Sequence, residues 1–166
     1  MLKLINRNNM MNQSLQNKTS NHYIDGQWIP GQGDPLISFN PADGEIIWKG
    51  THATSAEVKQ ACDAARQALP AWAALESSAR IQYLLAFGKY IETQRTELSE
   101  LIAKETGKPL WEAHTEVTAV VGKIKLSIQA FHERTSEKQV PVPQASGFIR
   151  YKPRGVVAVL GPFNFP

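Results

Sequence analysis

One polar side chain stands between two aromatic ones near the end of the chain, in the stretch Phe163-Asn164-Phe165. A side-chain amide can donate a hydrogen bond to an oxyanion that develops during a reaction. The stretch follows five consecutive apolar residues, 156–160, which predict a strand buried on both faces. Sheets of the α/β class bind ligands at the carboxyl ends of such strands. Asn164 is therefore the foremost candidate for a catalytic residue, and the alternative is an asparagine that caps a turn.

Three other stretches carry side chains that could do chemistry, and each has a simpler interpretation. Cys62 could be a nucleophile, but it lies on the apolar stripe of a predicted helix, which favours a buried structural thiol. Glu112 and Glu116 share a helix face and could form an acid–base pair, although a solvated face is the default. The sequence Gly107-Lys108-Pro109 lacks the phosphate-loop pattern, because proline replaces the required hydroxyl residue, and predicts a helix end followed by a helix start.

Composition narrows the possible partners. The net charge of +3 arises within residues 1–20, which hold three basic and no acidic side chains, so the rest of the chain is formally neutral. This distribution argues against a nucleic-acid partner. No stretch approaches the roughly 20 apolar residues of a transmembrane helix, which argues against a membrane partner. With a single cysteine and no close histidine spacing, we expect no metal site and a reducing, cytoplasmic location.

The first third of the chain predicts a tail and two strand regions. Residues 1–20 are polar and asparagine-rich, which is typical of a disordered tail. The stretch HYIDGQWIPGQG, residues 22–33, contains an Asp-Gly turn signal and predicts a hairpin. Turn signals at 40–41 and 43–44 precede a predicted strand at 45–48.

Helices are predicted from residue 54 onward. Thr54 and Glu57 form a capping box that starts a helix, and Pro70 is expected to interrupt it. Further helices are predicted from Ser77 or Ser78, over 96–106, and from Pro109 to about residue 133. The apolar positions at helical spacing are expected to be buried: Val58, Ala61, Cys62, Ala65, Leu69, Ile81, Leu84, Leu85, Ile91, Val117, Val120, Val121, Ile124, Ile128 and Phe131.

The amino-acid composition changes again at residue 139, where proline, glycine and β-branched residues become frequent. The sequence predicts an extended arm, a strand over 148–152, a turn at 153–155 and the buried strand 156–160. A strand apolar on both faces needs parallel neighbours from further βα units, and the sequence contains none after it.

Three motifs resemble those of the aldehyde dehydrogenase family. They are PRGVVAVLGPFNFP at 153–166, FNPADGEIIWKG at 39–50 and ETGKP at 105–109. The likeness spans about residues 22–166. One departure is Phe163, where the general family usually has tryptophan.

The resemblance implies an α/β fold, with the chain forming the N-terminal part of a Rossmann-type NAD-binding domain. Residues 21–138 would supply short hairpins and helices of that domain, and residues 139–152 a strand arm that pairs with a neighbouring subunit. Residues 153–166 would supply the first buried strand and the active-site loop. The parent would then be a homo-oligomer, a dimer or larger, and the catalytic domain would be absent from this chain.

The resemblance also implies roles for the last residues. Asn164 matches the catalytic asparagine of the family, whose amide shares the oxyanion hole of a thiolate-mediated aldehyde oxidation. Four residues match the loop beside the nicotinamide ribose of NAD: Leu160, Gly161, Pro162 and Phe163. The nucleophilic cysteine and the general-base glutamate of the family lie downstream of the matched region, and Cys62 does not match that nucleophile.

The stretch 105–135, followed by GPFNFP, resembles one branch of this family, and this resemblance implies a small aldehyde substrate, N-succinylglutamate semialdehyde. We expect the chain to be a fragment, a truncated gene product or a partial record, inactive alone. Two alternatives stay open at this point. One is a dehydrogenase for another aldehyde, such as betaine aldehyde or an aromatic aldehyde, with NAD or NADP. The other is a short non-catalytic protein that pairs with a partner through the 139–152 arm.

Overall fold

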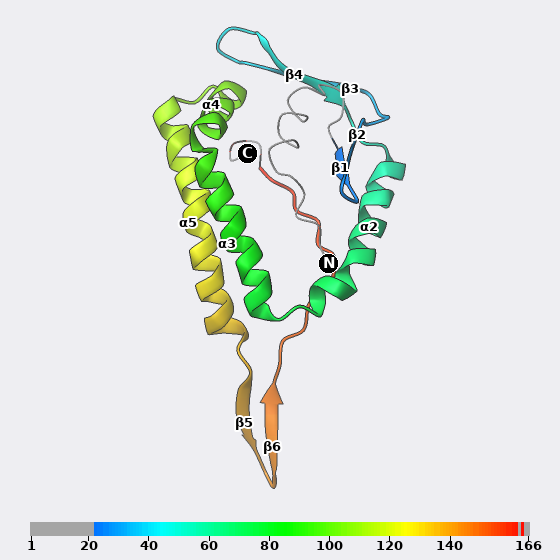
Figure 1. The fold of residues 1–166 in the computed structure, drawn as a ribbon, viewed down its shortest axis with the longest axis vertical. Helices are drawn as coiled ribbons and strands as arrows, with labels where there is room; N and C mark the ends of the chain where they lie inside the picture. Colours follow the sequence, from blue (N-terminus) through cyan, green and yellow to red (C-terminus); the bar gives the residue numbers. More distant parts are fainter. Residues whose placement is uncertain (1–21, 163, 165–166) are drawn as a thin grey trace. The chain divides into compact units, whose positions relative to one another are not determined.

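The structure is a computed structural model that describes residues 22–162 and 164. It divides into two compact units, one made of residues up to 68 with 104–107, and the other of 69–103 with residues from 108 onward. The first unit holds two hairpins and most of one helix, and the second holds two paired helices and a third hairpin (Figure 1).

The first hairpin forms where the Asp-Gly signal predicts it. Strands β1 (His22–Ile24) and β2 (Gln27–Ile29) pair antiparallel, with Tyr23 opposite Trp28. Asp25 and Gly26 connect them, with φ angles of 50° and 76°. A two-residue turn with both φ angles positive matches the right-handed twist of the flanking strands, so the local sequence accounts for this element.

The second hairpin is longer than the sequence predicts. Strand β3 (Pro35–Phe39) pairs antiparallel with β4 (Ile46–Thr51), and the register is irregular between Ser38 and Phe39. The connecting turn is closed by Asn40, whose amide nitrogen Nδ2 donates to Asp43 at 2.8 Å. The predicted turns are confirmed, and β4 begins one residue later and ends three residues later than expected.

Helix α2 (Ser55–Ala73) begins at the predicted capping residues but does not stop at Pro70. The backbone N–H of Thr54 donates to Glu57 Oε2 at 2.7 Å, which is the carboxylate half of a capping box. The Thr54 hydroxyl also donates to that carboxylate, at 3.0 Å. The predicted interruption at Pro70 is wrong. Proline removes only its own N–H bond, while its carbonyl still accepts from Ala74 at 3.0 Å, so the last turn survives.

Glu57 also ties the helix to the chain that follows β2. Its Oε2 accepts from the backbone N–H of Gln32 at 3.2 Å, and its side chain is buried. The hydrogen bond from the Thr54 backbone, supported by those from Gln32 and the Thr54 hydroxyl, holds the pKa of Glu57 below its usual value, although burial acts in the opposite direction. The charged form of Glu57 therefore stabilises this unit.

Replacing Glu57 by glutamine tests this linkage. Because the folded pKa of Glu57 is lowered, its contribution is complete above the unfolded pKa of about 4.3 and is lost as the pH falls through the folded value. Urea unfolding is followed by the circular dichroism signal of the helices. Between pH 6 and pH 3.5, we expect the urea midpoint of the unsubstituted chain to fall more than that of Glu57→Gln. Equal losses in both chains would contradict the assignment.

The second unit is organised by α3 (Ser77–Thr93) and α5 (Leu110–Thr135), which pack side by side (Figure 1). Between them in the chain comes α4 (Arg95–Thr106), whose last residues belong to the first unit and which is followed by Gly107 with φ 72°. These helix positions agree with the sequence predictions to within two residues. The helices approach closely at Gly88, where an added Cβ would lie 2.7 Å from Cδ1 of Ile124.

Many of the predicted core positions are exposed. Val58 is 55% exposed, and four helix positions expected to be buried are 40–44% exposed: Leu84, Leu85, Val120 and Phe131. Among the described residues, the buried apolar side chains are Ile24, Ala113 and Val117. Helical spacing identifies which face is apolar, but burial also requires a second layer against that face. The described residues do not provide that layer for most of these positions.

The region after α5 forms a hairpin in place of the predicted extended arm and 148–152 strand. Strand β5 (Lys138–Val142) pairs antiparallel with β6 (Ala145–Ile149). The turn at Pro143-Gln144 places Gln144 at φ 59°. Glutamine is not a common residue in this conformation, so the sequence carried no strong turn signal, and the second strand was predicted too late.

The predicted buried strand over 156–160 is absent from the structure. No strand is formed by residues 151–162, and Val159 and Leu160 are 87% and 94% exposed. A strand is stabilised by ladder hydrogen bonds to a neighbour, and none of the described strands pairs with this stretch.

None of the described helices combines the length and apolar character needed to cross a membrane.

Two glycines in the helix pair should respond oppositely to added side chains. Gly122 of α5 has no described atom within 4 Å of an added Cβ, so Gly122→Ala should stabilise by about 0.4–1 kcal/mol. Gly88→Leu should push α5 away from α3 and destabilise by about 1–3 kcal/mol. Thermal unfolding of both variants, followed by the helical signal, checks this. A Gly88→Leu chain as stable as the parent would mean that the close approach is not maintained.

Candidate active-site loop

Asn164 lies in a turn and is exposed. Three residues of the predicted cofactor loop, Leu160, Gly161 and Pro162, precede it and are also exposed. The fourth, Phe163, lies outside the described residues, as does Phe165. The described part of the loop is therefore an accessible segment that ends in one polar side chain.

The main chain of this loop is contacted by a lysine that is distant in the sequence and belongs to the same unit. Lys108 Nζ donates a hydrogen bond to the backbone carbonyl oxygen of Asn164 at 3.1 Å. These residues are 56 positions apart in the sequence. Lys108 lies between α4 and α5, after Gly107 and before Pro109, the residue that caps α5 with φ −58°. The tight connection between the helices thus sets where the lysine begins.

Lys108 also forms an ion pair with Glu116 Oε1 on α5. Both side chains are largely withdrawn from water, with 13% of Lys108 and 8% of Glu116 exposed. Glu116 lies in the same stretch of α5 as the buried residues Ala113 and Val117. Removing two charges from water is costly unless the remaining hydrogen-bonding capacity is used. The Asn164 carbonyl uses part of that capacity, because a lysine ammonium has three donors.

Sequence reasoning missed this arrangement. Glu116 was expected on a solvated helix face and is buried. That expectation is wrong: Glu116 is paired with a cation eight positions earlier in the sequence, which balances its charge away from water. Lys108 was interpreted only as part of a helix boundary. The available signal was the pattern Gly107-Lys108-Pro109, which fixes the backbone on both sides of the lysine and hence where its side chain starts.

Cys62 lies on α2 in the first unit and is half-buried, as suits a structural thiol. Within the described residues, no group of three or more histidine, cysteine, aspartate or glutamate side chains gathers to hold a metal ion. Glu112, the partner first considered for Glu116, is partly buried, and Glu116 is paired with Lys108.

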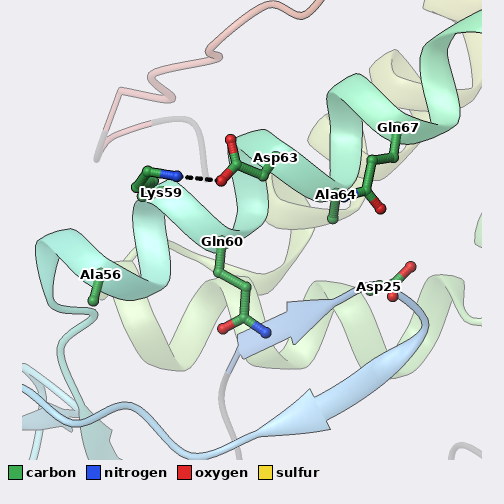
Figure 2. A pocket seen from close by; sticks show the side chains of 7 residues that line it. All are labelled: Asp25, Ala56, Lys59, Gln60, Asp63, Ala64 and Gln67. Atoms are coloured by element: carbon green, nitrogen blue, oxygen red, sulfur yellow. Dashed lines mark hydrogen bonds and ion pairs between the residues drawn. The ribbon is translucent and has the colours of Figure 1, made fainter.

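A shallow hollow on the first unit offers no comparable site. It is lined by side chains from α2 together with Asp25 of the first turn, and Figure 2 shows Lys59 directed at Asp63. These two form an exposed ion pair one helical turn apart, and the hydrogen bond from Lys59 lowers the pKa of Asp63. Such a pair is typical of a solvated helix surface.

Comparison with known proteins decides the family. Residues 28–166 match the family model described as the aldehyde dehydrogenase family. The chain belongs to the aldehyde dehydrogenase family. The resemblance inferred from the three sequence motifs is thereby confirmed.

Curated relatives of this aldehyde dehydrogenase chain share about half of its residues. It is 50% identical over 147 residues to N-succinylglutamate 5-semialdehyde dehydrogenase of Ectopseudomonas mendocina, covering 89% of this chain and 30% of the relative. The protein of the same name from Escherichia coli K12 is 47% identical over 144 residues, covering 87% of this chain and 29% of the relative. The chain therefore spans about 30% of the length of these relatives.

Solved structures confirm the predicted fold. A NAD-dependent benzaldehyde dehydrogenase from Corynebacterium glutamicum superposes with a TM-score of 0.69 at 29% identity, covering 77% of this chain and 28% of the other. A betaine aldehyde dehydrogenase double mutant from Staphylococcus aureus, in complex with NAD+, gives 0.81 at 23% identity, covering 95% and 32%. At that identity the second likeness supports the fold alone.

Proposed function

We propose that this chain supplies the oxyanion-binding loop of a dehydrogenase that oxidises N-succinyl-L-glutamate 5-semialdehyde to N-succinylglutamate with NAD+. The observation that carries the proposal is the 50% identity over 147 residues to a relative of that name. The loop itself adds support, because Asn164 is exposed and its main chain is anchored. A single cysteine suits a cytoplasmic enzyme.

The chemical role of Asn164 follows from its amide group. When a nucleophile attacks an aldehyde carbonyl, negative charge develops on the carbonyl oxygen. A preorganised amide N–H that donates to this oxygen lowers the barrier, and losing one such donor typically reduces the rate by about 10²–10³-fold. The donor works best when it does not need to reorient during the reaction, so the position of the Asn164 backbone matters.

The residues before Asn164 are the proposed contact with the nicotinamide-ribose side of the cofactor. At Gly161 an added Cβ would meet no described atom within 4 Å, so the backbone is open to a close approach from outside. Leu160 and Pro162 flank it with exposed apolar surface. When bound, NAD+ would accept the hydride of the aldehyde. Leu160, Gly161, Pro162 and Phe163 would hold the nicotinamide-ribose side and limit the access of water.

The proposal can be tested in a chimera in which residues 22–166 replace the matching segment of the Escherichia coli relative. We expect the chimera to form NADH from N-succinylglutamate semialdehyde, and the 166-residue chain alone to form none. Asn164→Ala should lower kcat by about 10²–10³-fold, because one oxyanion donor is lost. Stopped-flow and steady-state NADH absorbance give both kcat and KM.

Asn40→Ala is the matched control, since it removes a turn asparagine of the first unit. It should leave kcat unchanged. An Asn164→Ala chimera with kcat within threefold of the parent would contradict the role of Asn164. A chimera that folds and binds NAD+ but never turns over would contradict the proposed function of the segment.

The hairpin β5–β6 is the proposed contact with a second copy of the enzyme. It carries exposed apolar side chains, including Val142 at 41%, Phe148 at 51% and Ile149 at 45%. In the described residues its strands pair only with each other, which leaves each outer edge open to another strand.

Charges placed on that hairpin should weaken assembly. We expect the double variant Val142→Lys/Phe148→Lys of the chimera to shift towards monomer, because it replaces apolar contact area with two like charges. Gln139→Lys adds charge without removing apolar surface and should shift assembly less. Sedimentation velocity at several protein concentrations measures both, and identical distributions for all three proteins would exclude the hairpin as the contact.

A further inference from the structure

Among the described residues, Lys108 has a side chain that contacts the backbone of the candidate catalytic residue, Asn164. Its Nζ lies 3.1 Å from the carbonyl oxygen of Asn164, and its charge is balanced by Glu116. All three residues belong to the same compact unit. The contact is to the main chain of Asn164, so it leaves the side-chain amide available.

The base of the lysine is fixed by the backbone on both sides. Gly107 takes a left-handed conformation with φ 72°, which glycine adopts without strain, and Pro109 has a φ restricted by its ring. The far end of the lysine is fixed by Glu116, which α5 carries next to the buried Val117. A long flexible side chain is thus ordered at both ends before it meets the loop.

The ion pair with Glu116 orients the ammonium group of Lys108. With only 13% of its side chain exposed, Lys108 has little water to hydrogen-bond. An ammonium withdrawn from water needs acceptors for its protons. Glu116 and the Asn164 carbonyl are two such acceptors, and a charge-assisted hydrogen bond is stronger than a neutral one.

We infer that Lys108, oriented by Glu116, is a positioning residue that fixes the backbone of Asn164 and thereby aims its amide at the reacting oxygen. This inference rests on the proposed function. In this role Lys108 acts on the reaction through the backbone of Asn164 and not by contact with the substrate. Misplacing a catalytic group by about 1 Å can reduce a rate by about 10²-fold.

The simpler alternative is that the ion pair only stabilises the corner between α4 and α5. The two roles predict different measurements. A corner clamp should change thermal stability, with kcat following only the fraction of folded enzyme. A positioning residue should lower kcat in fully folded enzyme, leave KM for aldehyde and NAD+ nearly constant, and have no effect once Asn164 can no longer donate.

The first test uses the chimera with Lys108→Met, which keeps the length of the stem and removes charge and donors. We expect kcat to fall by about 10–10²-fold. This loss is smaller than that expected for Asn164→Ala, which removes the amide donor itself. Glu116→Gln should give a smaller loss, because the lysine keeps its charge and its hydrogen bond to the Asn164 carbonyl. Glu112→Gln, one turn earlier on α5, is the matched control and should leave kcat unchanged.

The second test is the double variant Lys108→Met/Asn164→Ala. Two residues that act as one unit are not additive, so this variant should be no slower than Asn164→Ala alone. If the two losses multiply, or if Lys108→Met leaves kcat unchanged while Asn164→Ala lowers it, the inference is overturned. If Asn164→Ala itself has no effect, the proposed function fails, and this result is distinct from the first two.

A third variant separates positioning from folding. Lys108→Met leaves Glu116 buried without its partner, which can destabilise the enzyme for reasons unrelated to catalysis. Lys108→Met/Glu116→Gln removes both charges and should recover the thermal midpoint of the parent. We expect kcat to stay as low as in Lys108→Met, because the anchor to Asn164 is still missing. Recovery of kcat together with the thermal midpoint would overturn the inference in favour of the corner clamp.

Discussion

The close approach of α3 and α5 at Gly88 is the contact from which the second unit is organised. A single added carbon there would lie 2.7 Å from Ile124 Cδ1, which is well inside van der Waals distance. This contact sets how α5 lies against α3. Because α5 carries Glu116, and Glu116 holds Lys108, the placement of the helix decides where the ammonium meets the loop. A close contact between two apolar surfaces thus governs a polar interaction at the candidate site.

The ion pair between Lys108 and Glu116 is better understood as a means of orientation than as a source of stability. Buried pairs often contribute little net stability, since desolvation offsets their attraction. Their geometry is nevertheless demanding, because each unused hydrogen-bonding group is unfavourable in a poorly solvated place. The Asn164 carbonyl, at 3.1 Å from the lysine, meets part of that demand. A polar network with few alternatives holds its members in one arrangement, which suits a catalytic donor.

Local signals in the sequence predicted most of the elements. The Asp25-Gly26 turn, the carboxylate cap of α2 and the helix end at Gly107 depend on backbone preferences of a few neighbouring residues, and all three form. Features that depend on distant partners were predicted less well. The 156–160 stretch has strand composition but no described strand beside it. Glu116 is buried and paired with a lysine whose position helical periodicity cannot predict. A sequence motif is enough to identify Asn164 as the candidate residue. Its contact with Lys108 is apparent only in the folded structure.

The hydrogen bond from Lys108 closes a long loop of chain, and regular structure within that loop changes its entropy. The two residues are 56 positions apart. If all of that chain were free, bringing its ends together would be far less favourable than one hydrogen bond could offset. However, α5 and the β5–β6 hairpin occupy most of the interval, leaving 16 of the described residues outside these elements. Each halving of the free length lowers the closure entropy term by about 0.6 kcal/mol, so this shortening by a factor of roughly three amounts to about 1 kcal/mol. The helix and the hairpin therefore make it easier for a single side chain to capture the loop.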